Sequence, residues 1–196
     1  LGEVVAHYLQ QGIIPIVLGG GHETTLGHFH GYVGAKRAAT LVNLDAHPDV
    51  RELVDGKPHS GCSFREAILH PSKLCQSYIV AGLQPQACST AHLRFVDEHR
   101  SQRLWVSELS TEQISALFNQ LHERSNVNSV LVSIDLDVVD QAFAPAVSSP
   151  ACGGISPALL FHFAYEAGRS PKVSSLDIVE LNPQFSQDDQ TAGLGA

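Results

Sequence analysis

Two short motifs place potential metal ligands directly after apolar runs of the kind that form buried strands. The apolar run 40–44 leads into Asp45-Ala46-His47-Pro48-Asp49, which offers three ligands within five residues. A second run, 130–134, leads into Asp135-Leu136-Asp137. Extended backbone points the side chains at alternate positions to one side. Because ligands bind beyond the carboxyl ends of strands in open α/β sheets, we expect both motifs at one sheet edge.

A third apolar run, 13–18, leads into Gly19-Gly20-Gly21-His22 and adds a second imidazole. The set then contains four carboxylates and two imidazoles, which suit Mn²⁺, Fe²⁺, Co²⁺ or Zn²⁺. One four-coordinate ion does not need six ligands, whereas two ions with bridging carboxylates do. The alternative is that Asp45 and Asp135 only cap strand ends. Four carboxylates in one cleft would repel each other without a cation, so the combined pattern favours a two-metal site.

Four further side chains are candidates for catalysis or substrate binding, each with a simpler alternative. His59 lies in the polar loop 46–63, and its imidazole could shuttle a proton or be a solvated loop histidine. Arg51 and Arg65 could bind a substrate carboxylate, or pair with neighbouring glutamates at the surface. Glu180 ends an apolar run, where a substrate-binding carboxylate or an ordinary strand-end charge would lie.

The other histidines and the cysteines carry no comparable pattern. The four cysteines lack CxxC spacing, so we expect reduced thiols in a cytoplasmic protein. The three glycines lack the spacing and the lysine of a phosphate-binding loop. Eight histidines lie on helical patterns or at their edges, and we assign them structural roles: His7, His28, His30, His70, His92, His99, His122 and His162.

The composition favours one globular domain over residues 1–196. The 20 acidic and 12 basic residues give a net charge of −8, which argues against a nucleic-acid-binding surface. No apolar run reaches the roughly 20 residues of a membrane span, and no signal-peptide pattern is present. The chain contains no methionine. We therefore expect a fragment of a longer protein that is truncated at both ends.

Helical and strand patterns alternate along the chain. Helices are expected at 3–11, from His22 onward, and at 64–69, 87–100, 110–124 and 156–168, the last with Ser156 as N-cap and Gly168 as its stop. Strands are expected at 13–18, 40–45, 77–82, around 104–106, and at 129–135 and 172–180. A long loop is expected at 138–155. Apolar strands between helices predict an α/β/α three-layer sandwich with a mostly parallel sheet.

The motifs together resemble the ureohydrolase family of arginases, agmatinases and formimidoylglutamases. The resemblance is carried, in order, by Gly19-Gly20-Gly21-His22, by Asp45-Ala46-His47-Pro48-Asp49, by the segment 133–140 and by Leu176-Asp177-Ile178-Val179-Glu180-Leu181-Asn182-Pro183. It covers nearly the whole chain and implies an arginase-like fold. The family domain is longer, so the resemblance also implies that an N-terminal part and the last helix are absent.

The resemblance implies a pair of Mn²⁺ ions and a role for each motif residue. It assigns one ion to His22, Asp45, Asp49 and Asp135, and the other to His47, Asp45, Asp135 and Asp137. Water activated by the two ions would attack the trigonal carbon of a guanidine or amidine. Asp137 would orient this water and accept its proton, His59 would shuttle a proton, and Glu180 would bind the substrate cation.

Within the family, several features favour formimidoylglutamase, which hydrolyses N-formimidoyl-L-glutamate in histidine degradation. Gly21 replaces the usual aspartate, and Arg51 stands where arginases have an asparagine. The segments 82–86, 181–185 and 189–192 also resemble that subfamily. Arg51 and Arg65 would suit a substrate with two carboxylates. An agmatinase or guanidinobutyrase and a catalytically silent metal-binding fragment are the alternatives, and we expect a homo-oligomer.

Overall fold

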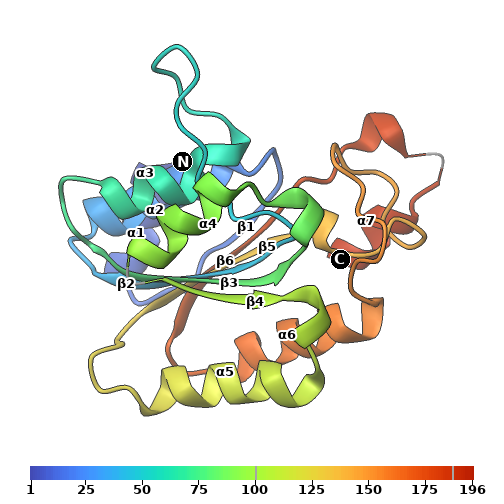
Figure 1. The fold of residues 1–196 in the computed structure, drawn as a ribbon. Coiled ribbons are helices and arrows are strands. Elements are labelled where there is room, and N and C mark those ends of the chain that lie inside the picture. The colour runs from blue at the N-terminus through green and yellow to red at the C-terminus, as the bar shows by residue number, and fades with distance from the viewer. Residues whose placement is uncertain (100, 187) are drawn as a thin grey trace.

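The computed structural model describes residues 1–99, 101–186 and 188–196 and shows one six-stranded sheet between helices (Figure 1). The strands are β1 (Ile16–Leu18), β2 (Ala39–Leu44), β3 (Cys75–Leu83), β4 (Ser101–Trp105), β5 (Val130–Asp135) and β6 (Val173–Val179). Their order is β1-β6-β5-β2-β3-β4, and every described pairing is parallel. The predicted three-layer α/β/α sandwich with a parallel sheet is confirmed.

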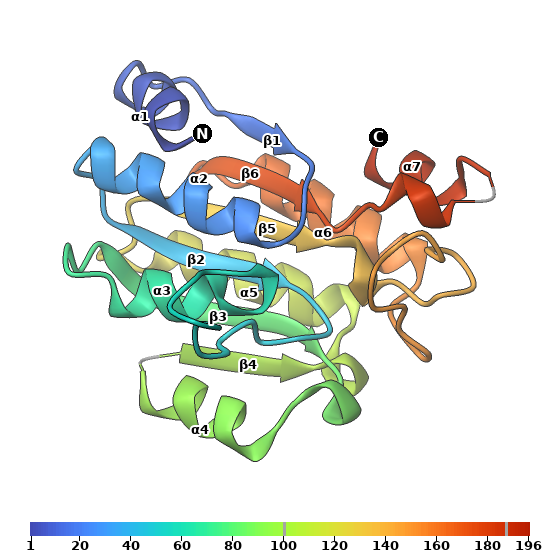
Figure 2. The same cartoon turned by 90° about the horizontal axis from the view of Figure 1, so that it is seen from above.

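Helices cover both faces of the sheet. One face carries α1 (Gly2–Gln10), α2 (Glu23–Gly34), α3 (Ser63–Leu69) and α4 (Thr90–Glu98), and the other carries α5 (Thr111–Glu123) and α6 (Pro157–Arg169) (Figure 1). The short α7 (Gln190–Gly195) contacts the turn that follows β5, near the ends of the strands (Figure 2). Within the described ranges, no helix has the length and apolar character needed to cross a membrane.

Two apolar cores, one on each face, hold these layers together. Alternate residues of β2 serve both cores: Val42 and Leu44 pack toward α5 and α6, while Leu41 packs toward α2 and α3. All six residues of β2 are buried. Burial of each Leu or Val side chain of this strand contributes about 1.5–3 kcal/mol. The central strands are therefore rigid supports for the side chains that follow their carboxyl ends.

The prediction of a buried strand over 13–18 is wrong. The strand β1 has three residues, and its side chains Ile16 and Leu18 are 66% and 72% exposed. The reason is its position, because β1 lies at the sheet edge and pairs with β6 on one side only. Hydrophobicity correctly indicated a strand but did not reveal that it is an edge strand.

The helix boundaries agree with the prediction in part. Ser156 caps α6 by accepting a hydrogen bond from the Leu159 N–H at 3.3 Å, as predicted. Gly168 does not end that helix, which continues to Arg169. The predicted helix 87–100 begins later, at Thr90, after a 3-10 turn at 85–87, and residue 100 lies outside the described residues. The helix α7 was not predicted.

Candidate metal centre and active site

Both aspartate motifs form the same local turn at the ends of adjacent strands. Asp45 directly follows β2, and its Oδ1 accepts a hydrogen bond of 2.7 Å from the His47 N–H. Asp135 ends β5, and its Oδ1 accepts a hydrogen bond of 2.8 Å from the Asp137 N–H. Because β2 and β5 are neighbours in the sheet, the two turns lie side by side. In both turns the second oxygen, Oδ2, points toward His22.

The glycine segment brings His22 to the same place. Gly19 and Gly20 have φ values of +106° and +78°, in the left-handed region that glycine adopts without strain. Gly20 also accepts a hydrogen bond of 2.9 Å from the Glu180 N–H, which fixes the segment beside the end of β6. His22 then stands as the residue before α2, with its imidazole buried.

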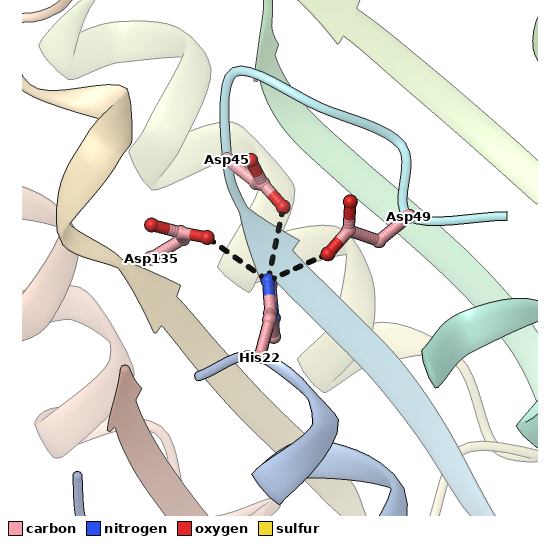
Figure 3. Close-up of side chains that lie close together, drawn as sticks. All are labelled: His22, Asp45, Asp49 and Asp135. Atoms are coloured by element: carbon pink, nitrogen blue, oxygen red, sulfur yellow. Dashed lines mark ion pairs between the residues drawn. The ribbon is translucent and has the colours of Figure 1, made fainter. Parts of the chain in front are cut away.

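A first group of four ligand side chains consists of His22 and three aspartates that surround its Nδ1 atom (Figure 3). This nitrogen lies 3.3 Å from Asp45 Oδ2, 3.0 Å from Asp49 Oδ2 and 3.0 Å from Asp135 Oδ2. All four residues are buried. Three carboxylate oxygens thus converge on one buried imidazole nitrogen.

A second group lies directly beside the first and shares one residue with it. The Nδ1 atom of His47 is 3.3 Å from Asp45 Oδ1 and 3.1 Å from Asp137 Oδ2. Asp45 therefore belongs to both groups, with one oxygen facing each. Asp135, which the resemblance makes a second bridge, belongs to the first group only. The six side chains singled out from the sequence are brought together in these two groups.

Neighbouring side chains hold the Asp45 motif in place. The Asn43 side-chain amide donates to Asp45 Oδ2 at 2.9 Å, and the Tyr78 hydroxyl donates to the Pro48 carbonyl at 2.8 Å. Asp49 has φ +45°, a conformation that is strained for a residue other than glycine. Such strain is kept only where the surrounding structure imposes it, and here it turns the carboxylate of Asp49 toward His22.

The charges of the two groups shift the pKa values of their members. Burial lowers the pKa of His22, but the carboxylates of Asp135, Asp45 and Asp49 outweigh burial and raise it well above its usual value. The pKa of His47 is raised to about 12, because Asp137 and Asp45 outweigh the effect of burial. Burial, together with the charge of Asp45, raises the pKa of Asp137 to about 7. The centre therefore attracts positive charge.

In the described ranges of the chain, two of the ligand atoms lack hydrogen bonds that a divalent metal ion would replace. His22 Nδ1 is buried, yet within the described part of the chain no hydrogen bond of acceptable geometry satisfies it. The same holds, among the residues that the structure describes, for Asp137 Oδ1. An orphaned buried polar atom is costly unless it has a partner. Imidazole nitrogen with carboxylate oxygen is a ligand set for divalent transition metals, including Mn²⁺.

An open cavity of about 440 Å³ leads to these groups from solvent. Asp49, Asp135 and Asp137 line its acidic part. Glu180 also lines it, with Oε2 accepting a hydrogen bond of 2.8 Å from the Ser148 hydroxyl. Arg51 from the loop 46–63 contributes a positive charge to the same lining. The cavity thus offers carboxylates for a cationic group and a guanidinium for an anionic one.

Two sequence-predicted residues do not line this cavity. The His59 ring contacts the Glu52 carbonyl through Nε2 at 3.0 Å and accepts from the Gly61 N–H through Nδ1 at 3.2 Å. The Arg65 guanidinium lies 4.5 Å from the centre of the Phe95 ring and 3.3 Å from Glu52 Oε1. For Arg65 this arrangement matches the alternative of a surface ion pair that the sequence left open.

Among the cavity-lining residues that were not singled out, His92, Ser148 and Ser149 lie near the candidate site residues. His92, assigned a structural role from its helical pattern, faces it from α4, where burial and the nearby Arg51 lower its pKa. Ser148 and Ser149 come from the loop 138–155, and the Ser149 hydroxyl lies 3.3 Å from His47 Nε2. A serine pair in a polar loop gives no recognisable signal in a single sequence.

Comparison with known proteins gives one family for the whole chain. The sequence model of the arginase family matches residues 1–196. The chain is 31% identical over 200 residues to a formimidoylglutamase of Geobacillus thermodenitrificans, which covers all of this chain and 61% of that protein. It is 37% identical over 205 residues to a formimidoylglutamase of Rhodococcus jostii, which covers all of this chain and 63% of the relative.

Solved structures agree with the sequence comparison. A formiminoglutamase of Trypanosoma cruzi with Mn²⁺ has a TM-score of 0.87 and 27% identity, over 99% of this chain and 65% of the other. A proclavaminate amidino hydrolase from Streptomyces clavuligerus has a TM-score of 0.79 and 25% identity, over 98% of this chain and 65% of the other. The chain therefore spans less than two thirds of the length of these relatives.

Proposed function

This chain belongs to the arginase family, and from that premise we propose that its protein is a manganese hydrolase acting on N-formimidoyl-L-glutamate. The reaction uses one water molecule, yields L-glutamate and formamide, and belongs to histidine degradation. The observation that carries the proposal is the pair of ligand groups joined by Asp45. The formimidoylglutamases among its relatives support the choice of substrate. In this proposal residues 1–196 form a single catalytic domain.

The two ligand groups would hold two Mn²⁺ ions. His22, Asp45, Asp49 and Asp135 would bind one ion, and Asp45, His47 and Asp137 would bind the other, with Asp135 as a further bridge by resemblance to the family. Two adjacent cations supply, when bound, a water nucleophile that is deprotonated near neutral pH. Buried carboxylates that would otherwise repel one another gain a partner for their negative charge.

Asp137 is the residue we assign to proton transfer from the attacking water. Asp137 lines the cavity, and its Oδ1 atom accepts no hydrogen bond within the described residues, so no protein donor occupies this carboxylate oxygen. The oxygen of that water forms a bond to the formimidoyl carbon, and the bond from this carbon to the glutamate nitrogen breaks. That nitrogen must gain a proton to leave as an amine. Asp137 is a carboxylate within the site that can carry the proton to it.

His59 is the second candidate for proton transfer, by its place in the sequence. Both ring nitrogens are engaged with the loop backbone, at Glu52 and Gly61. Its use as a shuttle would require the ring to leave these partners and turn toward the cavity. In the loop conformation described above, we assign protonation of the leaving amine to Asp137. His59 would take this role only if the loop rearranged.

Charged residues of the cavity would orient the substrate. Glu180 would bind the amidinium group, because a carboxylate and an amidinium form paired, charge-assisted hydrogen bonds. Arg51 would bind a carboxylate of the glutamate part in the same way. Arg65 is held by Phe95 and Glu52, so the proposal rests on Arg51 for this contact.

A guanidino compound is the second candidate substrate. The likeness to a proclavaminate amidino hydrolase favours it, and Glu180 would bind a guanidinium as well as an amidinium. The two candidates differ in their product, because an amidine of this type yields formamide and a guanidine yields urea.

A substrate panel tests the proposal. The Mn²⁺-loaded protein would be incubated with formimidoylglutamate, agmatine, arginine and guanidinobutyrate, and formamide and urea would be measured. Formamide from the first compound, lost after chelation, supports the proposal. Urea from a guanidino compound, with no formamide from the first compound, would identify the guanidino compound as the substrate. If neither product forms, the protein binds metal without this activity.

A further inference from the structure

A buried series of hydrogen-bonded polar side chains extends from His22 through β5 and β6 to α2. The Nε2 atom of His22 is 2.9 Å from the Ser133 hydroxyl of β5. That hydroxyl donates in turn to Asp177 Oδ1 of β6. The other oxygen of Asp177 lies 2.7 Å from His28 Nδ1 of α2. All four side chains are buried, and neither Asp177 nor His28 has a part in the function proposed above.

Hydrogen-bonding rules fix the direction of each bond in this chain. Asp177 Oδ1 accepts the hydrogen bond from Ser133, so the single proton of the Ser133 hydroxyl points to it. The Ser133 oxygen is then left with lone pairs toward His22, which must donate through Nε2–H. A neutral imidazole with its proton on Nε2 has a bare lone pair on Nδ1. That atom is the one that faces Asp45, Asp49 and Asp135.

Two residues of α2 hold Asp177 in this orientation. The Thr25 hydroxyl donates to Asp177 Oδ1 at 3.1 Å, and the His28 ring donates from Nδ1 to Oδ2. The Nε2 atom of His28 is buried and has no hydrogen-bond partner in the described part of the chain. Burial of this unpaired nitrogen is energetically unfavourable, and Asp177 is the hydrogen-bond partner of the other ring nitrogen.

We propose that Asp177, held by His28, is a positioning residue that acts through Ser133 to keep His22 in its metal-binding tautomer. The outer hydrogen bonds of a metal-binding histidine fix the ring and increase its affinity for metal, and their loss typically costs about 10–100-fold in affinity. The inference rests on the metal-binding part of the proposed function and is independent of the substrate. It concerns the first ligand group only, because in the described part of the protein the polar contacts of His47 go to Asp45, Asp137 and Ser149.

A merely structural role is the competing explanation, because the same hydrogen bonds join α2 to the sheet. The two roles differ in what a substitution changes. A structural role lowers the stability of the metal-free protein and leaves the relative affinities of the two ions unaltered. If the role is positioning, a substitution lowers the affinity for the ion bound by His22 and leaves the affinity for the ion bound by His47 unaltered.

The test is Mn²⁺ titration of Asp177→Asn by calorimetry, without substrate, together with the melting temperature of the metal-free protein. We expect the affinity for one ion to fall about 10–100-fold and the affinity for the other to stay the same. Ser133→Ala, a smaller change, should lower the affinity for the same ion. It replaces Asp177→Asn in the test if that variant does not fold.

Tyr32→Phe is the matched control. Its hydroxyl bonds to Ser174 and Ser175 in the same buried layer between α2 and β6, at 2.7 and 2.6 Å. This variant should melt at a lower temperature and bind both ions with unchanged affinity. Wild-type affinity for both ions in Asp177→Asn and Ser133→Ala would overturn the proposal, as would equal weakening of both ions. Failure of the unaltered protein to bind Mn²⁺ would overturn the metal-binding part of the proposed function as well.

Discussion

The side chain of Glu180 accepts a hydrogen bond of 2.6 Å from the backbone N–H of His22. Glu180 has φ +69°, so its backbone is held in a strained conformation at the end of β6. The bond joins the residue assigned to the substrate cation to a residue assigned to the metal. This bond therefore connects the candidate substrate-binding residue directly to a candidate metal ligand.

Glu180→Gln should weaken substrate binding more than metal binding. The amide keeps the shape of the side chain but removes the charge that faces an amidinium, and hydrogen bonds to charged groups contribute about 1.5–3 kcal/mol. We expect kcat/KM to fall about 10–100-fold with the Mn²⁺ content preserved. Ser148→Ala, which removes only the bond to Glu180 Oε2, is the control and should have a smaller effect. Unaltered kcat/KM in Glu180→Gln would remove this residue from the substrate site.

Asp45→Asn should weaken the binding of both ions, because Asp45 is the residue that the two ligand groups share among the described residues. Asp49→Asn should impair only the ion bound by His22. The bound Mn²⁺ per chain, measured after dialysis, distinguishes these results. Asp140→Asn is the control, because Asp140 caps the backbone N–H groups of Ala142 and Gly153 in the loop that follows β5. Retention of two ions by Asp45→Asn would contradict the bridging role.

The metal-free protein should lose stability as pH rises. Asp137 has a folded-state pKa of about 7, above its unfolded value, because of burial and the charge of Asp45. The folded state therefore keeps a proton that the unfolded state has lost between about pH 4 and about pH 7. His47, with a pKa of about 12, extends the same trend above its unfolded value of about 6.5.

Melting temperatures of the metal-free protein at about pH 5 and about pH 8 measure this loss. We expect the lower value at the higher pH, a smaller difference in Asp137→Asn, and recovery when Mn²⁺ supplies the missing positive charge. A melting temperature that rises with pH in the metal-free protein would contradict the assignment of these protons.

Arg51→Ala should raise KM for formimidoylglutamate about 10–100-fold, the range for hydrogen bonds to a charged group. The KM for a formamidine without carboxylates should stay the same, since Arg51 would have no carboxylate to bind in that substrate. Lys57→Ala, in the same exposed loop but outside the cavity lining, is the control. If the two substrates respond equally, Arg51 does not bind the carboxylate.

Gly82→Ala should destabilise the support of Asp45. Gly82 has φ +102° at an irregularity in the pairing of β3 with β4, and an added Cβ would lie 2.6 Å from Val138 Cγ2. We expect a loss of about 1–3 kcal/mol in the free energy of unfolding. Gly168→Ala in α6 is the control, with no atom near the new Cβ, and should add about 0.5–1 kcal/mol. Equal stability of the two variants in denaturant titration would contradict this view of Gly82.

The sequence predicts the central sheet well because β2 and β5 are buried on both faces, which leaves continuous apolar runs. It predicts the members of the ligand groups because Asp45 and Asp135 each begin a short motif that follows a buried strand, but the turns that direct these side chains and the φ of +45° at Asp49 were not predicted. The exposure of β1 could not be predicted in this way, because it depends on which strand pairs with it.

Other parts of the site depend on contacts between distant segments. His28 and Asp177 meet only because α2 packs on β6, and no motif joins them in the chain. Ser148 reaches Glu180 from an irregular loop. The orientation of His59 depends on its hydrogen bonds to backbone groups of its own loop. The sequence pattern that suggested a proton shuttle does not reveal these bonds.

The most direct test of the two-metal centre is the Mn²⁺ bound to the protein, counted by elemental analysis and examined by electron paramagnetic resonance. Two ions sharing the carboxylate of Asp45 would lie about 3.5–4 Å apart, as in other two-metal sites, and would be magnetically coupled. We predict two ions per chain with the spectrum of a coupled pair. A single ion per chain, or two ions with the spectra of isolated Mn²⁺, would contradict the account.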